Sequence, residues 1–258
     1  MTVATPPVER IDHAEAPGAV ILRIHRPEVR NALAAEHMLE ASRILADCQH
    51  DARVQVVFIT GSSGAFCAGA DLKALNAQDS GARAQSIAAS TELMTRIVNT
   101  PKIVVAAVNG ASAGLGNHIA ICADLCFASS DATFNFTGAV KGIPSLQYGA
   151  LLLPMAIGMK RAKALLLRGG RLTAQRALEL GLCNEVFAPE RWDAEIAAIA
   201  QEFAGRDAAT LAHNKLQANQ FAYQMAGALQ LSALAGAAHM AAKESFVTGG
   251  VHRGKGSA

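Results

Sequence analysis

Hydrophobic residues along this chain fall into short β-branched runs, and longer stretches between them repeat their apolar positions at helical spacing. The short runs predict strands at 19–24, 54–60, 102–108, 125–129, 133–136 and 183–187. The helical spacing predicts helices at 32–48, 73–99, 149–157, 160–168 and 173–180, and a short one ending near Ala123. Residues 1–18 form a loose or short-strand lead-in. Strand–helix alternation up to residue 187 predicts an α/β core.

Beyond Pro189 the pattern is helical only. Helices are predicted at 190–204, 208–221 and about 223–245. The chain therefore divides into a core at 1–195 and a C-terminal helical region at 196–258. The alanine-rich faces of this region suit burial against the core or against another subunit.

Composition narrows the class of protein. Hydrophobic residues make up 51% of the 258 residues and aromatic residues only 5%, so small aliphatic side chains do most of the packing. The net charge of +2, without a basic run, argues against nucleic-acid binding. Five cysteines without a C-x-x-C pair indicate reduced thiols and a cytoplasmic protein. We expect no secretory signal, no membrane span and no metal site.

Two loops rich in small residues carry the candidate chemistry. The loop at 64–72 follows the strand at 54–60, and the loop at 109–117 follows the strand at 102–108. Small residues let a ligand approach the backbone, and the start of a helix leaves N–H groups without partners. Two such N–H groups converging on one carbonyl oxygen would form an oxyanion hole.

The two glycine-rich loops also match, in whole or in part, three other known motifs. A dinucleotide fingerprint fails because Ile119 replaces its third glycine, and a phosphate-binding P-loop fails because Ala70 and Asp71 replace Lys and Ser/Thr. The segment 110–114 matches the G-x-S-x-G nucleophile elbow, which leaves open a serine hydrolase that uses Ser112. Its partners would be downstream residues such as Asp193 and His239.

Read together, the loops resemble a known family. Four segments match its motifs in order and at its spacing: Arg26-Pro27-Glu28-Val29-Arg30-Asn31-Ala32-Leu33, Ala65-Phe66-Cys67-Ala68-Gly69-Ala70-Asp71-Leu72, residues 107–124 with Gly114-x-Gly116 and Cys122-Ala123-Asp124, and residues 173–186. These segments are similar to those of the enoyl-CoA hydratase/isomerase (crotonase) superfamily. The resemblance runs almost from end to end of the chain.

The resemblance implies a spiral of ββα units, a C-terminal helical trimerisation region, and a homotrimer or dimer of trimers. It implies acyl-CoA thioesters as substrates, with coenzyme A part of the substrate and no tightly bound cofactor. The oxyanion donors fall on the N–H groups of Ala70 and Leu115. The nucleotide pocket falls on Glu28, Val29, Arg30, Ala68, Asp71, Leu72 and Lys73. Arg30 and Lys73 are candidates to meet the phosphates, with Arg253 or Lys255 reaching a neighbouring subunit.

The chain departs from the family pattern at the acid/base positions. Hydratases of this family use two glutamates, and those positions hold His118 and Gly138 here. Because one imidazole can carry a proton between two carbon atoms, we expect isomerase-type or other non-standard enolate chemistry rather than ordinary hydration. Asn117, Asn135, Gln147 and Tyr148 are further candidates for the pocket wall. The segment 142–149 also departs, since its proline comes one residue early.

Three functions therefore remain open from sequence alone. The first is an acyl-CoA enzyme that stabilises a thioester enolate with Ala70, Leu115 and His118. The second is the serine hydrolase that uses Ser112. The third is a non-catalytic acyl-CoA-binding subunit that kept the pocket and lost the acids. The sequence does not define the acyl group.

Overall fold

The computed structural model describes residues 5–71, 80–145, 147–220 and 224. Its larger sheet has six strands in the order β1-β2-β3-β5-β7-β10, parallel except for the β1–β2 pair. The strands are β1 (Val8–Asp12), β2 (Ala19–Ile24), β3 (Val56–Gly61), β5 (Ile103–Val108), β7 (Leu125–Ser129) and β10 (Glu185–Phe187). The five strands predicted for this sheet are confirmed, and β1 lies in the lead-in.

A second sheet has four short strands in the order β4-β6-β8-β9. They are β4 (Ala65–Cys67), β6 (Ala111–Ala113), β8 (Thr133–Phe136) and β9 (Gly170–Thr173). Only β8 was predicted, because β4 and β6 are three-residue strands of mostly small residues and β9 begins with glycine. None of these three unpredicted strands is long enough to show the alternation of apolar and polar residues that marks a strand.

Helices follow the pairs of strands. They are α1 (Ala35–His50), α3 (Ser80–Asn99), α4 (Leu115–Cys122), α5 (Gly138–Lys141), α6 (Gln147–Ile157), α7 (Met159–Arg168), α8 (Ala174–Leu180), α9 (Trp192–Ala204) and α10 (Ala208–Ala218). Single-turn 3₁₀ helices occupy Pro27–Val29 and Pro189–Arg191. Each pair β5–β6 and β7–β8 takes one strand from each sheet and leads into a helix, which is the predicted ββα spiral.

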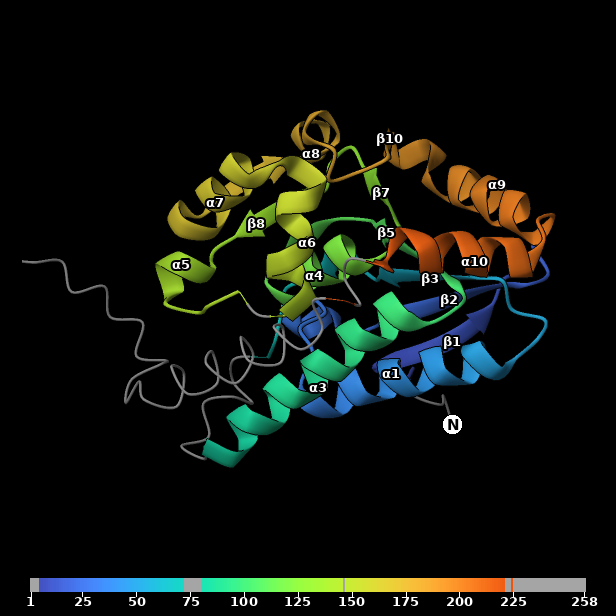
Figure 1. The fold of residues 1–258 in the computed structure, drawn as a ribbon, viewed down its shortest axis with the longest axis horizontal. Helices are drawn as coiled ribbons and strands as arrows, with labels where there is room; N and C mark the ends of the chain where they lie inside the picture. The colour runs from blue at the N-terminus through green and yellow to red at the C-terminus, as the bar shows by residue number, and fades with distance from the viewer. Residues whose placement is uncertain (1–4, 72–79, 146, 221–223, 225–258) are drawn as a thin grey trace, which may run out of the picture.

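The larger sheet is buried on both faces. Val57 and Ile59 of β3 belong to the main core, which includes residues of α1, α3 and α4. Their neighbours Val56 and Phe58 belong to a second core beneath α9. Figure 1 shows α1 and α3 side by side along the sheet and α9 apart from them. Two-sided burial explains why these strands are continuous hydrophobic runs.

The C-terminal helices pack onto the core as far as the structure describes them. Helix α9 runs across the predicted division at 195–196 and buries Ile196, Ala200 and Phe203. Helix α10 is anchored through Lys215, whose ammonium group binds Asp124 and the carbonyl oxygens of Ile97 and Lys102. The predicted helix at 223–245 and most of the trimerisation region lie outside the described residues.

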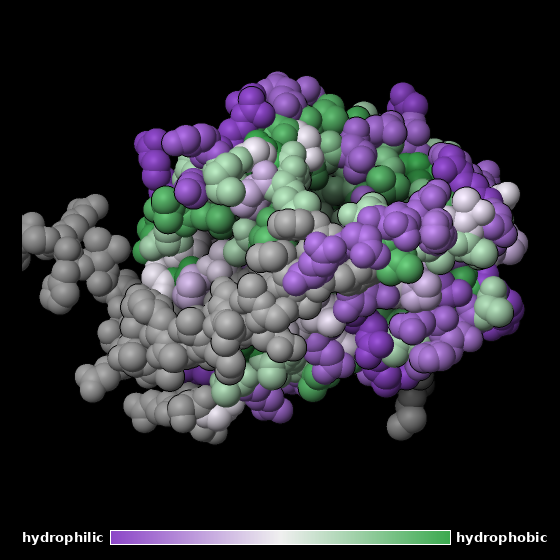
Figure 2. All heavy atoms as spheres, viewed as in Figure 1, coloured by the Kyte–Doolittle hydropathy of each residue, from purple (hydrophilic) through white to green (hydrophobic). Residues whose placement is uncertain are grey.

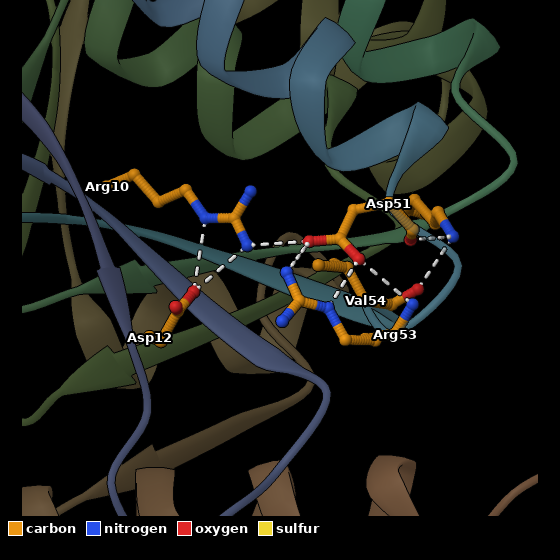
Figure 3. A network of polar contacts seen from close by, with 6 residues as sticks. Arg10, Asp12, Asp51, Arg53 and Val54 are labelled. Atoms are coloured by element: carbon orange, nitrogen blue, oxygen red, sulfur yellow. Dashed lines mark hydrogen bonds and ion pairs between the residues drawn. The ribbon is translucent and has the colours of Figure 1, made fainter.

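A polar network closes the edge of the fold where α1 turns into β3. The Asp51 carboxylate accepts hydrogen bonds from Arg10 and Arg53, and Arg10 also reaches Asp12 (Figure 3). The two guanidinium groups hold the pKa of Asp51 well below its usual range, Arg53 contributing most. Lys102 donates to the carbonyl oxygens of Asp51 and Val54. This network fixes the turn that aligns β3 with β5.

Candidate active site

The first glycine-rich loop is held by a short backbone pairing. Leu33 forms a parallel bridge with Ala70, in which the Leu33 N–H donates to the Gly69 oxygen and the Asp71 N–H donates to the Leu33 oxygen, both at 2.9 Å. In such a bridge the facing residue directs its own N–H and C=O to the opposite side. The N–H of Ala70 therefore points away from Leu33.

The turn before Leu33 is fixed by one buried side chain. The Asn31 side-chain amide donates to the carbonyl oxygens of Ser62 and Ala65, and its Oδ1 accepts from the Arg26 N–H. Asn31 is fully buried, so these bonds satisfy a group that would otherwise be costly to bury. The turn, and with it Leu33, is thereby tied to β4.

The two glycine-rich loops touch at Gly69. Its φ of +112° is one that side-chain-bearing residues rarely adopt. A Cβ placed on Gly69 would lie 3.1 Å from the Ala113 oxygen and 3.6 Å from the Leu115 nitrogen. The residue before Ala70 is therefore packed against the residues that open α4, and the two expected donors lie in adjoining backbone segments.

Leu115 is the first residue of α4. Gly114 precedes it with φ +52°, and the first helical hydrogen bond runs from the His118 N–H to the Gly114 oxygen at 3.1 Å. The Leu115 N–H lies in the first turn, where helices have no internal acceptors. Within the described ranges, neither the Ala70 N–H nor the Leu115 N–H donates to a protein acceptor.

Both residues line one cavity of about 170 Å³. Among the residues proposed from sequence, the wall includes Ala68, Ala70, Leu115, Asn117, His118, Asn135 and Gly138. The Asn117 amide donates to the Asn135 oxygen, while its buried Oδ1 has no partner in the described part of the chain. Apolar walls come from Ile87 of α3 and from Leu165 and Leu166 of α7. The cavity thus combines an apolar enclosure with a few polar groups, as small-molecule sites do.

His118 is held by a hydroxyl group in the cavity wall and by close packing against α6. Its Nε2 lies 3.0 Å from the Ser145 Oγ. On another side, a Cβ placed on Gly149 would come within 2.6 Å of the imidazole Cδ2, so α6 leaves no space between its backbone and the ring. Burial lowers the pKa of His118 to about 4, so the ring is neutral at physiological pH and available to accept a proton.

Gly138 cannot act as an acid or a base, and its surroundings exclude a larger residue. A Cβ placed there would lie 2.7 Å from the Ile143 oxygen, and the Ile143 N–H donates to the Gly138 oxygen. A glutamate at this position would require the segment up to Ile143 to move. The absence of a carboxylate at this position is therefore fixed by the local backbone.

The other residues proposed for the nucleotide pocket lie outside the cavity wall or outside the described residues. Glu28 and Arg30 are exposed on the turn after β2, with Val29 between them. The Asp71 carboxylate pairs with Arg26 at 3.0 Å. None of these lines the cavity in the described structure. Leu72, Lys73, Arg253 and Lys255 lie outside the described residues.

Ser112 does not have the environment of a nucleophile. It lies in β6 rather than at an exposed turn, and its side chain is completely buried. Its Oγ has no hydrogen-bond partner in the described ranges and does not line the cavity. Asp193 lies in the first turn of α9, and His239 lies outside the described residues. The structure therefore disfavours the nucleophile elbow.

Sequence reasoning missed the contacts that fix His118. Ser145 is 27 residues away along the chain, and only folding brings its hydroxyl group to the imidazole. The unusual segment 142–149 was a signal that this region differs, but it did not identify a pair. Tyr148, proposed for the pocket wall, is buried in the core instead. The side chain of Gln147 is outside the description.

The described ranges contain neither a metal-ligand cluster nor a helix suited to cross a membrane. No group of three or more His, Cys, Asp or Glu residues there is placed to hold a metal ion. No described helix is long and apolar enough to cross a membrane. All five cysteines are buried free thiols.

Sequence comparison places the cavity in a family context. The family model described as enoyl-CoA hydratase/isomerase matches residues 15–249. Crotonyl-CoA hydratase of Syntrophomonas wolfei is 33% identical over 207 residues, covering 78% of this chain and 77% of that protein. The 1,2-epoxyphenylacetyl-CoA isomerase of Escherichia coli is 32% identical over 181 residues, or 68% of each chain. Near-equal similarity to a hydratase and an isomerase does not separate the two reactions.

Solved structures agree on the fold. An enoyl-CoA hydratase from Bacillus anthracis superposes with a TM-score of 0.80 at 27% identity, covering 91% of this chain and 92% of that one. An enoyl-CoA hydratase/isomerase from Mycobacterium paratuberculosis gives 0.84 at 27% identity, with 93% and 95% covered. The crotonase fold expected from the sequence motifs is thereby shown.

Proposed function

This chain belongs to the enoyl-CoA hydratase/isomerase family, and on that premise we propose that it holds an acyl-CoA thioester with its carbonyl oxygen between the N–H groups of Ala70 and Leu115. The observation that carries the proposal is the pair of unpartnered donors in adjoining segments of one cavity wall. The Leu33 bridge directs one donor, and the start of α4 directs the other.

The chemistry of this arrangement is stabilisation of an enolate. When a proton leaves the α-carbon of a thioester, negative charge develops on the carbonyl oxygen. Two fixed N–H donors at that oxygen need no reorganisation as the charge grows, and loss of one such donor typically costs roughly 3–4 kcal/mol of barrier. The positive end of the α4 dipole acts in the same direction.

His118 is the proposed proton carrier. It lies three residues after Leu115 on α4, in the same cavity wall, and its neutral ring can take a proton from the α-carbon. Returning that proton to the γ-carbon shifts the double bond, with no net loss or gain of atoms. Hydration needs a second group to activate water, and the glutamate position at Gly138 has no space for one. Isomerase-type chemistry is therefore favoured over hydration.

The coenzyme A portion is proposed to leave the cavity along the turn after β2. Ala68 lines the cavity, and its N–H donates to the Arg30 oxygen at 3.0 Å. This hydrogen bond connects the turn to the cavity wall. The exposed guanidinium group of Arg30 is available for a phosphate. Glu28, Val29 and Asp71 are proposed to shape the same rim.

A panel of 2-enoyl-, 3-enoyl- and aromatic acyl-CoAs tests the proposal. We expect wild type to convert 3-enoyl to 2-enoyl thioesters, measured by absorbance of the conjugated thioester, and to exchange α-hydrogens for solvent deuterium. His118→Ala should lower both rates by about 10²–10⁴-fold while acyl-CoA binding persists. Hydration as the dominant reaction, or exchange unaffected by His118→Ala, would contradict the proposal. Binding without turnover of any substrate would instead support a non-catalytic subunit.

A trimer or dimer of trimers is proposed for the assembly. Figure 2 shows hydrophobic surface, in green, over α5 and α7. Within the described ranges, four of the six exposed large hydrophobic residues lie on α5, α6 and α7, while Leu39 and Leu216 lie on α1 and α10. The four are Val140, Met155, Met159 and Leu167. Exposed apolar residues gathered in one region suit contact with another subunit. Light scattering on the eluting protein would measure the assembly, and a monomer would refute this part.

A further inference from the structure

The contact between the His118 imidazole and the Ser145 hydroxyl group also suits nucleophilic catalysis by the serine. A hydroxyl oxygen 3.0 Å from a neutral imidazole nitrogen is the arrangement by which a base activates a serine nucleophile. Both side chains line the cavity that holds the Ala70 and Leu115 donors. We propose that Ser145 and His118 form a nucleophile–base pair, and that the protein hydrolyses acyl-CoA thioesters through an acyl-Ser145 intermediate. The proposal rests on the oxyanion hole of the proposed function.

Three observations favour Ser145 over Ser112 and Ser90 as the nucleophile. Ser145 is half-buried in the cavity wall, whereas Ser112 is fully buried and outside it. Ser90, also in the wall, donates its hydroxyl to the Ile87 oxygen. Among described residues, Ser145 is the serine whose hydroxyl is recorded at an imidazole of this cavity. Gly149 holds that imidazole from another side, so the pair is fixed.

The reaction balances with water as the only co-reactant. The Ser145 oxygen adds to the thioester carbonyl carbon, and His118 Nε2 takes the hydroxyl proton. The carbonyl oxygen becomes an oxyanion between the two backbone donors. The C–S bond then breaks, and His118 returns the proton to the sulfur, which releases free coenzyme A. Water, deprotonated by His118, then adds to the acyl-serine carbonyl carbon. The bond between that carbon and the Ser145 oxygen breaks, and His118 returns the proton to the serine oxygen, which releases the carboxylic acid and regenerates Ser145.

Within the described ranges the pair has no third member. In this part of the structure, no hydrogen bond joins the other ring nitrogen to a carboxylate. Burial accounts for the lowered pKa of the ring, with no contribution from a charged side chain. A dyad without an orienting acid is expected to be slower than a complete triad. Close packing between the ring and the α6 backbone at Gly149 leaves no room for a side chain on that side.

Benzoyl-CoA separates this activity from enolate chemistry, because it has no α-hydrogen to remove. We expect wild type to release coenzyme A from benzoyl-CoA, measured by chromatography, and Ser145→Ala to lower that release by about 100-fold or more. Mass spectrometry should find a benzoyl group on the peptide that contains Ser145. Ser130→Ala, which changes an exposed serine outside the cavity wall, is the matched control and should keep the wild-type rate.

Deuterium exchange into butyryl-CoA distinguishes the two proposals. Ser145→Ala removes the nucleophile and also one contact of His118, so its exchange of α-hydrogens should fall by about tenfold at most, far less than its hydrolysis of benzoyl-CoA. Exchange without benzoyl-CoA hydrolysis in wild type would overturn the hydrolase proposal and leave the proposed function standing. Equal hydrolysis by wild type and Ser145→Ala would also overturn it. Hydrolysis without exchange would refute the enolate proposal alone.

Discussion

Two polar clusters in this protein are built on opposite principles. Around Lys215, the ammonium group donates to three oxygens, and the Asp124 carboxylate also accepts from the Val104 N–H. Around His118, the Ala70 and Leu115 N–H groups and the Asn117 Oδ1 have no partner in the described residues. The first cluster satisfies its polar groups and holds α10 to the core. The second leaves donors unpaired inside a cavity, which is the mark of a site that awaits a ligand.

The difference shows which cluster contributes to stability and which to chemistry. Burial of Lys215 lowers the pKa of its ammonium group, while Asp124 counteracts that shift. Such a pair is costly to break because the remaining charge stays buried. The His118 cluster has less to lose structurally, since its unpaired groups have no partner in the described residues that a substitution could remove. Substitutions in the two clusters should therefore separate stability from activity.

The largest expected effect comes from Lys215→Ala. It leaves the Asp124 carboxylate buried without its cation, and the free energy of unfolding should fall by about 3–5 kcal/mol. Deuterium exchange into butyryl-CoA, per folded molecule, should stay near the wild-type value. Urea denaturation measures the free energy of unfolding. A stable variant with impaired exchange would reverse the roles assigned to the two clusters.

Leu115→Pro removes one proposed donor and should lower deuterium exchange into butyryl-CoA by about 10²–10³-fold. Proline is tolerated at the first position of a helix, where its missing N–H has no internal acceptor. Leu115→Ala is the matched control, because it removes the buried side chain and keeps the N–H. It should cost stability but little activity. Equal exchange rates in the two variants would argue against the donor.

The acid dependence of stability should identify His118 as buried and neutral. The pKa is about 4 in the folded protein, below the ~6.5 of an unfolded chain. As pH falls between these values, the unfolded state binds a proton that the folded state does not, so stability declines. When the pH is lowered from about 7 to about 5, the free energy of unfolding should fall by about 2 kcal/mol less in His118→Gln than in wild type.

The control for this measurement is His50→Gln, which changes an exposed histidine at the end of α1. It should follow the wild-type dependence on pH. If His118→Gln also followed it, the ring would not be held neutral by burial.

Gly149→Ala should have the smallest effect. The added methyl group would contact the imidazole at Cδ2, so we expect the ring to shift and exchange to slow by about tenfold, or roughly 1.4 kcal/mol of barrier. The stability change should be small, since alanine favours a helix by up to about 1 kcal/mol over glycine while the contact opposes it. Exchange kinetics and thermal unfolding measure the two effects. Unchanged exchange would mean that the ring can move without consequence.

Sequence predicted the larger sheet well because its strands are buried on both faces. The run at 103–108 is entirely apolar, and its strand was placed within one residue. The second sheet was missed because β4 and β6 have three residues each, and they pair through positions that are distant in sequence. Periodicity needs a longer segment than these strands supply.

The candidate site divides in the same way. The two loops were proposed from the glycine pattern, because small residues and a helix start form a local signal. The resemblance to the family then assigned the donors to Ala70 and Leu115. The His118–Ser145 contact and the exclusion of side chains at Gly138 and Gly149 depend on how α4, α6 and the segment up to Ile143 pack together. Such contacts between distant segments leave no periodic trace in one sequence.

Infrared difference spectroscopy of butyryl-CoA labelled with ¹³C at the carbonyl carbon measures directly, and without turnover, whether Ala70 and Leu115 polarise a thioester carbonyl. On binding, the labelled C=O band should move to a lower frequency than it has in water. Leu115→Pro should lose part of this shift, while Leu115→Ala should keep it. A band that stays at its position in water when the thioester is bound would show that the two N–H groups do not polarise the carbonyl.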